Sequence, residues 1–136
     1  MGKILKEYMM TAQKRVLVIG ASGFIGKKLL GVGKSREGIE LFGTGFGSVN
    51  AELITLDVRD PRMVENVIRR VQPDVIIYAV GVANVDRAET ERELTDELNA
   101  NALKHIANVF RGHLIYLSTH YVFDGMNPPY SADAKR

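Results

Sequence analysis

The chain has 136 residues, of which 46% are hydrophobic and 25% are charged, and these proportions are ordinary for a folded domain. Its formal net charge of +2 is too small to indicate a nucleic acid or an anionic membrane as a partner. It has no cysteine, which excludes disulfides and thiolate metal sites, and no apolar run approaches the ~20 residues that span a bilayer, so we expect a cytoplasmic protein.

Strand and helix patterns alternate along the sequence. Residues 1–13 lack the apolar stretch of a signal peptide, and we expect a flexible leader there, followed by one domain at 14–136. Short apolar runs predict five strands, at residues 15–19, 40–44, 52–56, 74–80 and 113–118. Helical patterns are found between them, at residues 24–30, 61–72 and 91–110. Asp60 is the expected N-cap of the second helix, with Pro61 in its first position. The tail from residue 124 is expected to be a loop.

This alternation predicts an α/β fold with right-handed crossovers and a parallel sheet. We expect a Rossmann-type, doubly wound sheet in the strand order 3-2-1-4-5, ending after about five strands. In such a sheet, a ligand binds at the carboxyl ends of strands one and four, where the direction of the crossovers changes.

A glycine pattern follows the first strand and opens the first helix. Gly20 permits a tight turn, Gly23 lets a diphosphate approach the backbone, and Gly26 lets the helix pack close to the strand. The intervening residues Ser22, Phe24 and Ile25 would then lie beside the diphosphate, at the electropositive start of the helix. The alternative is an ordinary strand-to-helix turn. The position directly after a strand favours a dinucleotide site.

The end of the second strand bears on the choice between NAD and NADP. A carboxylate there binds the ribose 2′-hydroxyl of NAD, whereas a basic residue accommodates the 2′-phosphate of NADP. The segment from Thr44 to Ser48 contains neither. The missing carboxylate favours NADP, or tolerance of both cofactors.

Several motifs resemble known families. The Gly-x-x-Gly-x-x-Gly spacing of residues 20–26 is similar to the extended short-chain dehydrogenase/reductase superfamily. Residues 118–125, Ser-Thr-His-Tyr-Val-Phe-Asp-Gly, resemble the Ser-Thr-Asp-Tyr-Val-Phe-Asp-Gly signature of the dTDP-4-dehydrorhamnose reductase family. The related beta subunit of methionine adenosyltransferase has a similar segment, followed by an Asn-Pro-Pro-Tyr like that of residues 127–130. Residues 73–77 and 85–89 also match these families, so the resemblance extends from residue 14 to the end.

The resemblance implies roles for residues along the cleft. Asp57 would meet the adenine amino group and Val58 would pack on the adenine ring. Ala79, Val80 and Gly81 would lie against the diphosphate and ribose. Without the resemblance, Asp57 could simply cap a turn, and the small residues after the fourth strand could simply allow tight packing.

The resemblance also implies roles for three polar residues near the nicotinamide and the substrate. Thr119 would hydrogen-bond the substrate carbonyl, and Ser118, the less favoured candidate for that role, would lie beside the nicotinamide. Asn101, which we expect beside the inner face of its helix, would help to hold the active-site backbone and a proton-relay water. From the residues alone, each of the three could be structural.

The chain also departs from the reductase pattern. His120 replaces the usual Asp, Tyr78 replaces Asn or His, and Val82 and Ala83 replace a more polar pair. The Tyr-x-x-x-Lys motif, which supplies the proton donor and its activating Lys in the family, is absent from these residues, as is the substrate-binding C-terminal half.

Two functions therefore stay open. The first is the NAD(P)-binding part of a nucleotide-sugar oxidoreductase, which in a full-length form would reduce the keto group of a dTDP-sugar but is inactive as this chain. The second is a non-catalytic, dinucleotide-binding regulatory or interaction subunit, like the methionine adenosyltransferase beta subunit. In both cases the fifth strand leaves an unprotected apolar edge, which predicts self-association.

Overall fold

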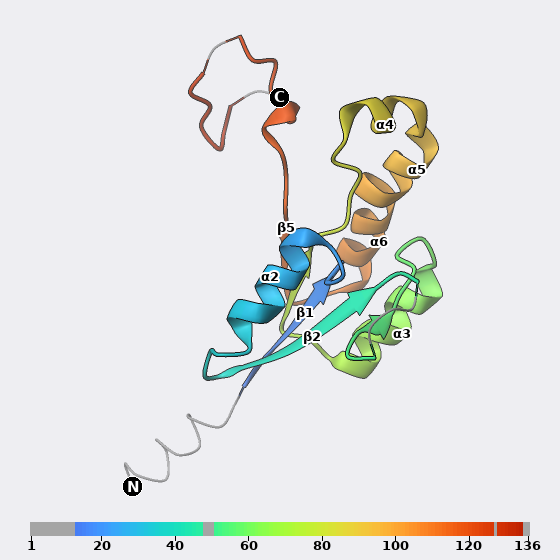
Figure 1. The fold of residues 1–136 in the computed structure, drawn as a ribbon, viewed down its shortest axis with the longest axis vertical. Coiled ribbons are helices and arrows are strands. Elements are labelled where there is room, and N and C mark those ends of the chain that lie inside the picture. Colours follow the sequence, from blue (N-terminus) through green and yellow to red (C-terminus); the bar gives the residue numbers. More distant parts are fainter. Residues whose placement is uncertain (1–12, 48–50, 127, 135–136) are drawn as a thin grey trace, which may run out of the picture.

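The sheet has the predicted topology. The computed structural model describes residues 13–47, 51–126 and 128–134, so the expected leader, apart from Gln13, lies outside the described residues. Five parallel strands form one sheet in the order β3-β2-β1-β4-β5 (Figure 1). The strands are β1 (Lys14–Ile19), β2 (Ile39–Gly45), β3 (Ile54–Thr55), β4 (Val75–Tyr78) and β5 (His113–Tyr116). The α/β, doubly wound architecture is confirmed.

Strand β1 lies at the centre of the sheet and is buried on both faces. Leu17 and Ile19 belong to the main core, which α3 (Pro61–Val71) and α6 (Ala102–Val109) cover. Val18 points to the opposite face, where α2 (Phe24–Gly33) packs on β1 and β2 (Figure 1). A continuous apolar run is the sequence pattern that such a two-sided environment requires.

Helix α3 forms as the sequence predicts. The Asp60 side chain accepts hydrogen bonds from the backbone N–H groups of Arg62 and Met63, and Pro61 occupies the first helical position. The buried residues Val64, Val67 and Val71 form the inner stripe. The helix ends at Gln72, whose backbone is left-handed, directly before Pro73.

The second half of the chain differs from the expected single helix over residues 91–110. That region contains α5 (Arg92–Asp96), the π-helical turn η1 (Glu97–Asn101) and α6. A further helix, α4 (Val85–Thr90), precedes it and was not expected. The two helices α4 and α5 are separate because the backbone departs from helical angles at Glu91, with φ −114° and ψ 51°. In the tail, a 3₁₀ turn covers His120–Val122, and the rings of Phe123 and Tyr130 stack at 4.4 Å.

The edge strand β5 leaves apolar side chains partly open. Ile115, Tyr116 and Leu117 are 39%, 41% and 38% exposed. Strand β5 is an edge strand of the described sheet, and self-association through it stays a prediction. Within the described residues, no helix combines the length and apolar character needed to cross a membrane.

Two glycines of α2 provide a matched test of this packing. A Cβ on Gly26 would collide with the Gly20 carbonyl oxygen and come within 2.6 Å of the Ala21 Cα, whereas a Cβ on Gly31 would meet no heavy atom within 4 Å. We expect Gly26→Ala to lower the free energy of unfolding by about 1–3 kcal/mol through overpacking. Gly31→Ala should raise it by up to about 1 kcal/mol, because Ala favours the helix. Urea denaturation of both variants measures the difference, and equal stabilities would contradict the packing described for Gly26.

Candidate nucleotide-binding site

A cleft of about 410 Å³ opens at the carboxyl ends of β1, β2 and β4. It brings together five segments that are distant in sequence: the glycine loop, the end of β2, the residues after β3, the residues after β4, and the helical segment that contributes Arg87, Leu94 and Leu98. Of the predicted site residues, those that line it are Gly20, Ser22, Gly23, Asp57, Val58, Ala79, Val80 and Gly81. The cleft thus lies at the edge of the sheet that the strand order predicts.

The glycine loop meets the geometric demands of a diphosphate site. Gly20 has φ +90°, and a Cβ there would lie 2.8 Å from the Val80 side chain and 2.9 Å from the Ala79 carbonyl oxygen. Gly23 donates its N–H to the Gly20 carbonyl at 3.0 Å and is the N-cap of α2, with no side-chain cap. The first N–H groups of α2 are therefore available to an anion. Phe24 and Ile25 follow at this helix start with exposed side chains.

The residues after β3 bring into the cleft an ion pair that the sequence pattern did not predict. Arg59 donates from Nη2 to Asp57 Oδ2 at 2.6 Å and from Nε to Asp57 Oδ1 at 2.9 Å. These hydrogen bonds lower the pKa of Asp57 below its usual range, so the carboxylate stays charged. The Arg59 guanidinium also lies 5.3 Å from the centre of the Phe46 ring. Because a carboxylate has about four acceptor positions, Asp57 could still accept from an adenine amino group.

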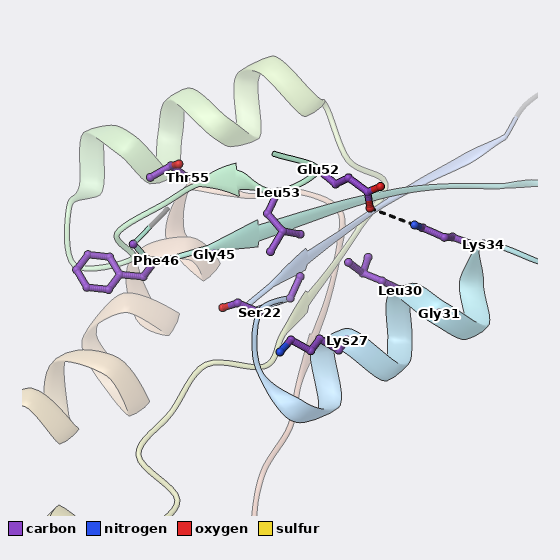
Figure 2. A pocket seen from close by; sticks show the side chains of 12 residues that line it. Ser22, Lys27, Leu30, Gly31, Lys34, Gly45, Phe46, Glu52, Leu53 and Thr55 are labelled. Atoms are coloured by element: carbon purple, nitrogen blue, oxygen red, sulfur yellow. Dashed lines mark hydrogen bonds and ion pairs between the residues drawn. The ribbon is translucent and has the colours of Figure 1, made fainter. Parts of the chain in front are cut away.

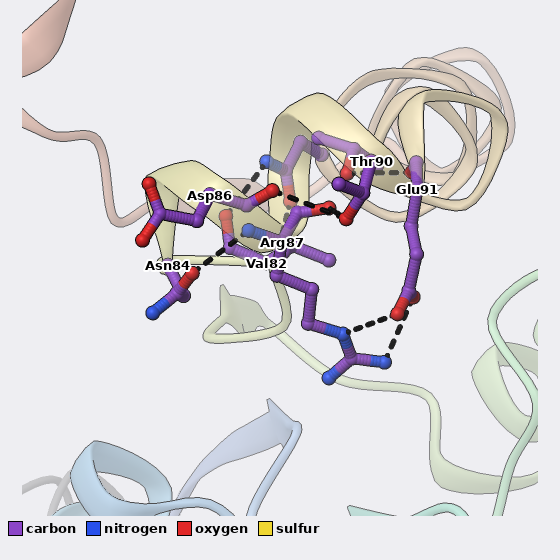
Figure 3. Close-up of polar contacts among 8 residues, drawn as sticks. Val82, Asn84, Asp86, Arg87, Thr90 and Glu91 are labelled. Atoms are coloured by element: carbon purple, nitrogen blue, oxygen red, sulfur yellow. Dashed lines mark hydrogen bonds and ion pairs between the residues drawn. The ribbon is translucent and has the colours of Figure 1, made fainter.

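A second arginine faces the cleft from α4. The Arg87 side chain donates from both Nε and Nη2 to the Glu91 carboxylate, each at 3.0 Å (Figure 3). Asn84 caps the helix by accepting from the Arg87 N–H at 2.8 Å. Arg87 was not predicted as a site residue, because the sequence pattern did not indicate the helix α4. Both cleft arginines are therefore neutralised by a neighbouring carboxylate.

The placement expected for Asn101 is wrong. Asn101 is exposed, and its side chain donates to Glu97 Oε1 at 2.8 Å. The residue that holds the backbone after β4 is Asn99, which accepts from Val82 N at 2.8 Å and donates to Val82 O at 3.2 Å. Leu98, Ala102 and Ile106 keep the inner face that the apolar pattern predicts, and Asn99, directly after Leu98, is the asparagine on the flank that faces the segment after β4.

Thr119 lies outside the main cleft. It lines a separate cavity of about 320 Å³ beside Val82, Asn84 and Arg92, and its Oγ1 accepts from Tyr121 N at 3.3 Å. Ser118 is exposed and lines none of the cavities described for this chain. The roles of Ser118 and Thr119 toward cofactor and substrate stay predictions.

Tyr78, one of the departures from the reductase pattern, is part of the core and has a structural role. It is completely buried and its hydroxyl donates to the Leu98 carbonyl at 2.6 Å. Burial raises the pKa of this phenol, which makes it unsuited to proton donation near neutral pH. Within the described residues, no cluster of three or more His, Cys, Asp or Glu side chains could hold a metal ion.

Comparison with known proteins identifies the family. Residues 14–136 match the family model described as the RmlD substrate binding domain. The chain belongs to this family. It is 35% identical over 121 residues to the methionine adenosyltransferase 2 subunit beta of Danio rerio, covering 88% of this chain and 37% of that protein. It is 39% identical over 72 residues to the dTDP-4-dehydrorhamnose reductase of Salmonella typhimurium, covering 51% of this chain and 24% of that enzyme.

Solved structures of the family have the same fold. A hypothetical dTDP-4-dehydrorhamnose reductase from Sulfolobus tokodaii superposes with a TM-score of 0.80 at 33% identity, over 89% of this chain and 45% of that one. The Bacillus anthracis dTDP-4-dehydrorhamnose reductase, solved in complex with NADP, gives a TM-score of 0.70 at 30% identity, over 85% of this chain and 40% of that one. The chain therefore spans less than half the length of these relatives.

The two asparagines provide a test of how the segment after β4 is held. Replacing Asn99 with Ala removes both hydrogen bonds to Val82, so we expect the free energy of unfolding to fall by about 1–3 kcal/mol. Asn101→Ala removes one exposed hydrogen bond and should cost less than about 0.5 kcal/mol. Both changes replace Asn by Ala in the same π-helical turn, so differences in helix propensity largely cancel. A greater loss for Asn101→Ala in chemical denaturation would contradict the assignment.

Proposed function

We propose that this chain binds a nicotinamide dinucleotide, as the cofactor-binding part of a dTDP-4-dehydrorhamnose reductase-like oxidoreductase acting on nucleotide sugars. The observation that carries the proposal is the N-terminus of α2, which has no side-chain cap and opens on the cleft at Gly23, where the missing side chain leaves room for a diphosphate. Backbone N–H groups and the helix dipole together favour an anion at this position.

The remaining walls of the cleft fit the rest of a dinucleotide. Val58 and Phe46 offer apolar surface for an adenine ring, and Asp57 offers an acceptor for its amino group. Val80 packs beside Gly20, and Gly81 also lines the cleft, so both could contact the part of a dinucleotide that extends beyond the diphosphate. Bound NADPH would supply a hydride, while these residues would bind the cofactor and orient it.

The choice between cofactors is part of the proposal. Over Thr44–Gly47 there is no carboxylate to hold a ribose diol, and Ser48, the last residue of the predicted segment, lies outside the described residues. The NADP complex of the Bacillus anthracis relative is in line with this composition. NADP(H) should therefore bind at least as well as NAD(H).

Catalysis would need groups that these 136 residues do not contain. None of the five tyrosines is followed by Lys four positions later. Thr119 could polarise a carbonyl but is a poor proton donor, and general acid catalysis typically contributes about 10²–10⁴-fold. The 136-residue chain on its own should therefore bind the cofactor without reducing a dTDP-4-keto-6-deoxysugar.

A second function fits the same site. The similarity to the methionine adenosyltransferase 2 subunit beta of Danio rerio covers 88% of this chain. On that reading the chain is a non-catalytic, dinucleotide-binding subunit, and co-purification with a methionine adenosyltransferase would favour it. We expect self-association through the edge strand β5 under either of the two proposed functions.

A glycine substitution tests dinucleotide binding directly. A Cβ on Gly23 would meet only the Gly20 carbonyl oxygen, at 3.3 Å, so the fold should accept a side chain there. The branched methyls of Gly23→Val would occupy the diphosphate position, and we expect at least about a tenfold loss of NADPH affinity by calorimetry. Gly23→Ala, with one methyl, is the control for folding and should lose less. If Gly23→Val binds NADPH as tightly as wild type does, and likewise NADH, the glycine loop is not the diphosphate site.

A further inference from the structure

A second cavity, of about 590 Å³, adjoins the nucleotide cleft at the end of β2 (Figure 2). Ser22, Gly45 and Phe46 line both cavities, so the two lie side by side. The walls of the second cavity come from α2, which contributes Lys27 and Lys34, and from the residues around β3. We call it the side cavity.

Lys27 places a positive charge on the side cavity for which the described residues provide no ion-pair partner. Lys34, at one end, donates to Glu52 Oε2 at 3.2 Å. Within the described residues, Lys27 Nζ has no carboxylate partner and the Ser22 hydroxyl has no hydrogen bond. A Cβ on Gly45 would lie 3.4 Å from Ser22 Oγ, so this hydroxyl faces the end of β2. In Figure 2 the side chains of Ser22 and Lys27 both extend toward the side of the cavity where Phe46 lies.

The side cavity lies where the 2′-substituent of the adenosine ribose of a bound dinucleotide would be. A dinucleotide with its diphosphate at Gly23 and its adenine at Asp57 and Val58 has its adenosine ribose at the end of β2, beside Gly45 and Phe46. The 2′-carbon of that ribose is where NAD carries a hydroxyl and NADP a phosphate. The side cavity opens at this point and can accept the larger substituent.

The cleft arginines are weaker candidates for such a phosphate. Arg59 is paired with Asp57 at 2.6 Å, so an incoming phosphate would meet the aspartate charge together with the arginine charge. Since charge–charge energy falls only as the inverse of distance, the repulsion would offset much of the attraction. The same holds for Arg87 and Glu91.

We infer that Ser22 and Lys27 form the subsite that recognises the 2′-phosphate of NADP(H), in place of the basic residue that the end of β2 lacks. Lys27 supplies the charge, Ser22 supplies a hydroxyl donor, and both approach from the start of α2, whose dipole also favours an anion. This inference rests on the proposed dinucleotide binding and names the residues that select the cofactor.

The experiment compares adenosine 2′,5′-bisphosphate with 5′-AMP, which differ only in the 2′-phosphate and need no nicotinamide pocket. Calorimetry on the 136-residue chain should give at least about a tenfold preference for the bisphosphate. Lys27→Ala should reduce that preference to less than about threefold while 5′-AMP affinity changes less than about twofold. Ser22→Ala should have an intermediate effect, and Lys27→Arg should retain the preference.

Lys28→Ala is the matched control, because Lys28 is the next residue of α2, is also exposed, and lines neither cavity. It should leave the preference unchanged, and thermal melts should show both lysine variants folded. A preference that survives Lys27→Ala, or that is lost in Arg59→Ala instead, overturns the inference. If the chain binds both nucleotides equally, the proposed subsite is wrong but the proposed function stands. If the chain binds neither nucleotide, both proposals are wrong. If inorganic phosphate alone competes away the preference for the bisphosphate, the cavity is a general anion site and the proposed subsite is wrong.

Discussion

The N-terminus of α2 can face the nucleotide cleft only because Gly26 packs directly on the backbone of Gly20 and Ala21. Any side chain at residue 26 would push the helix away from β1, and the first N–H groups of α2 would move with it. Strand β1 is the fixed element in this contact, since Leu17, Val18 and Ile19 are almost completely buried between β2 and β4. The position of the glycine loop is therefore set by packing in the middle of the sheet, where the structure has least freedom to move.

Charge compensation decides which parts of the cleft remain available to an anion. The two cleft arginines, Arg59 and Arg87, are held by Asp57 and Glu91. The two guanidinium groups form part of the walls of the cleft. Because each is paired with a carboxylate, the pairs add little net positive charge to it. Among the described residues, the donors without a partner at the start of α2 are its first backbone N–H groups and the side chains of Ser22 and Lys27. In the proposed site these donors would favour an anion along one line, from the glycine loop to the side cavity.

The parts of the fold that follow from local pattern could be predicted from the sequence. The apolar run of β1, the glycine spacing and the Asp60–Pro61 start of α3 each determine their structure within a few residues. The alternation of strands and helices was enough to give the strand order, and the loops at the carboxyl edge then followed as the site.

Other features depend on tertiary contacts that local pattern does not specify. Asn101 was expected to help hold the active-site backbone, whereas Asn99 holds the segment after β4, because the apolar pattern does not specify which flank of the helix faces that segment. Arg59 enters the site only because the chain turns back after β3 and brings it over Phe46. Lys27 lies on an exposed helix face, and its importance is visible only once the side cavity is seen beside it.

The most direct test of the account is a two-dimensional ¹H–¹⁵N NMR titration of the chain with NADPH, because it reports on every backbone N–H group at once. The account predicts that the largest shift changes fall on the amides of residues 20–27, 44–47, 57–59 and 79–82, with little change at the opposite end of the sheet. Shift changes confined to the tail or to the edge strand β5, or none at millimolar NADPH, would contradict a dinucleotide site at the carboxyl ends of β1 and β4.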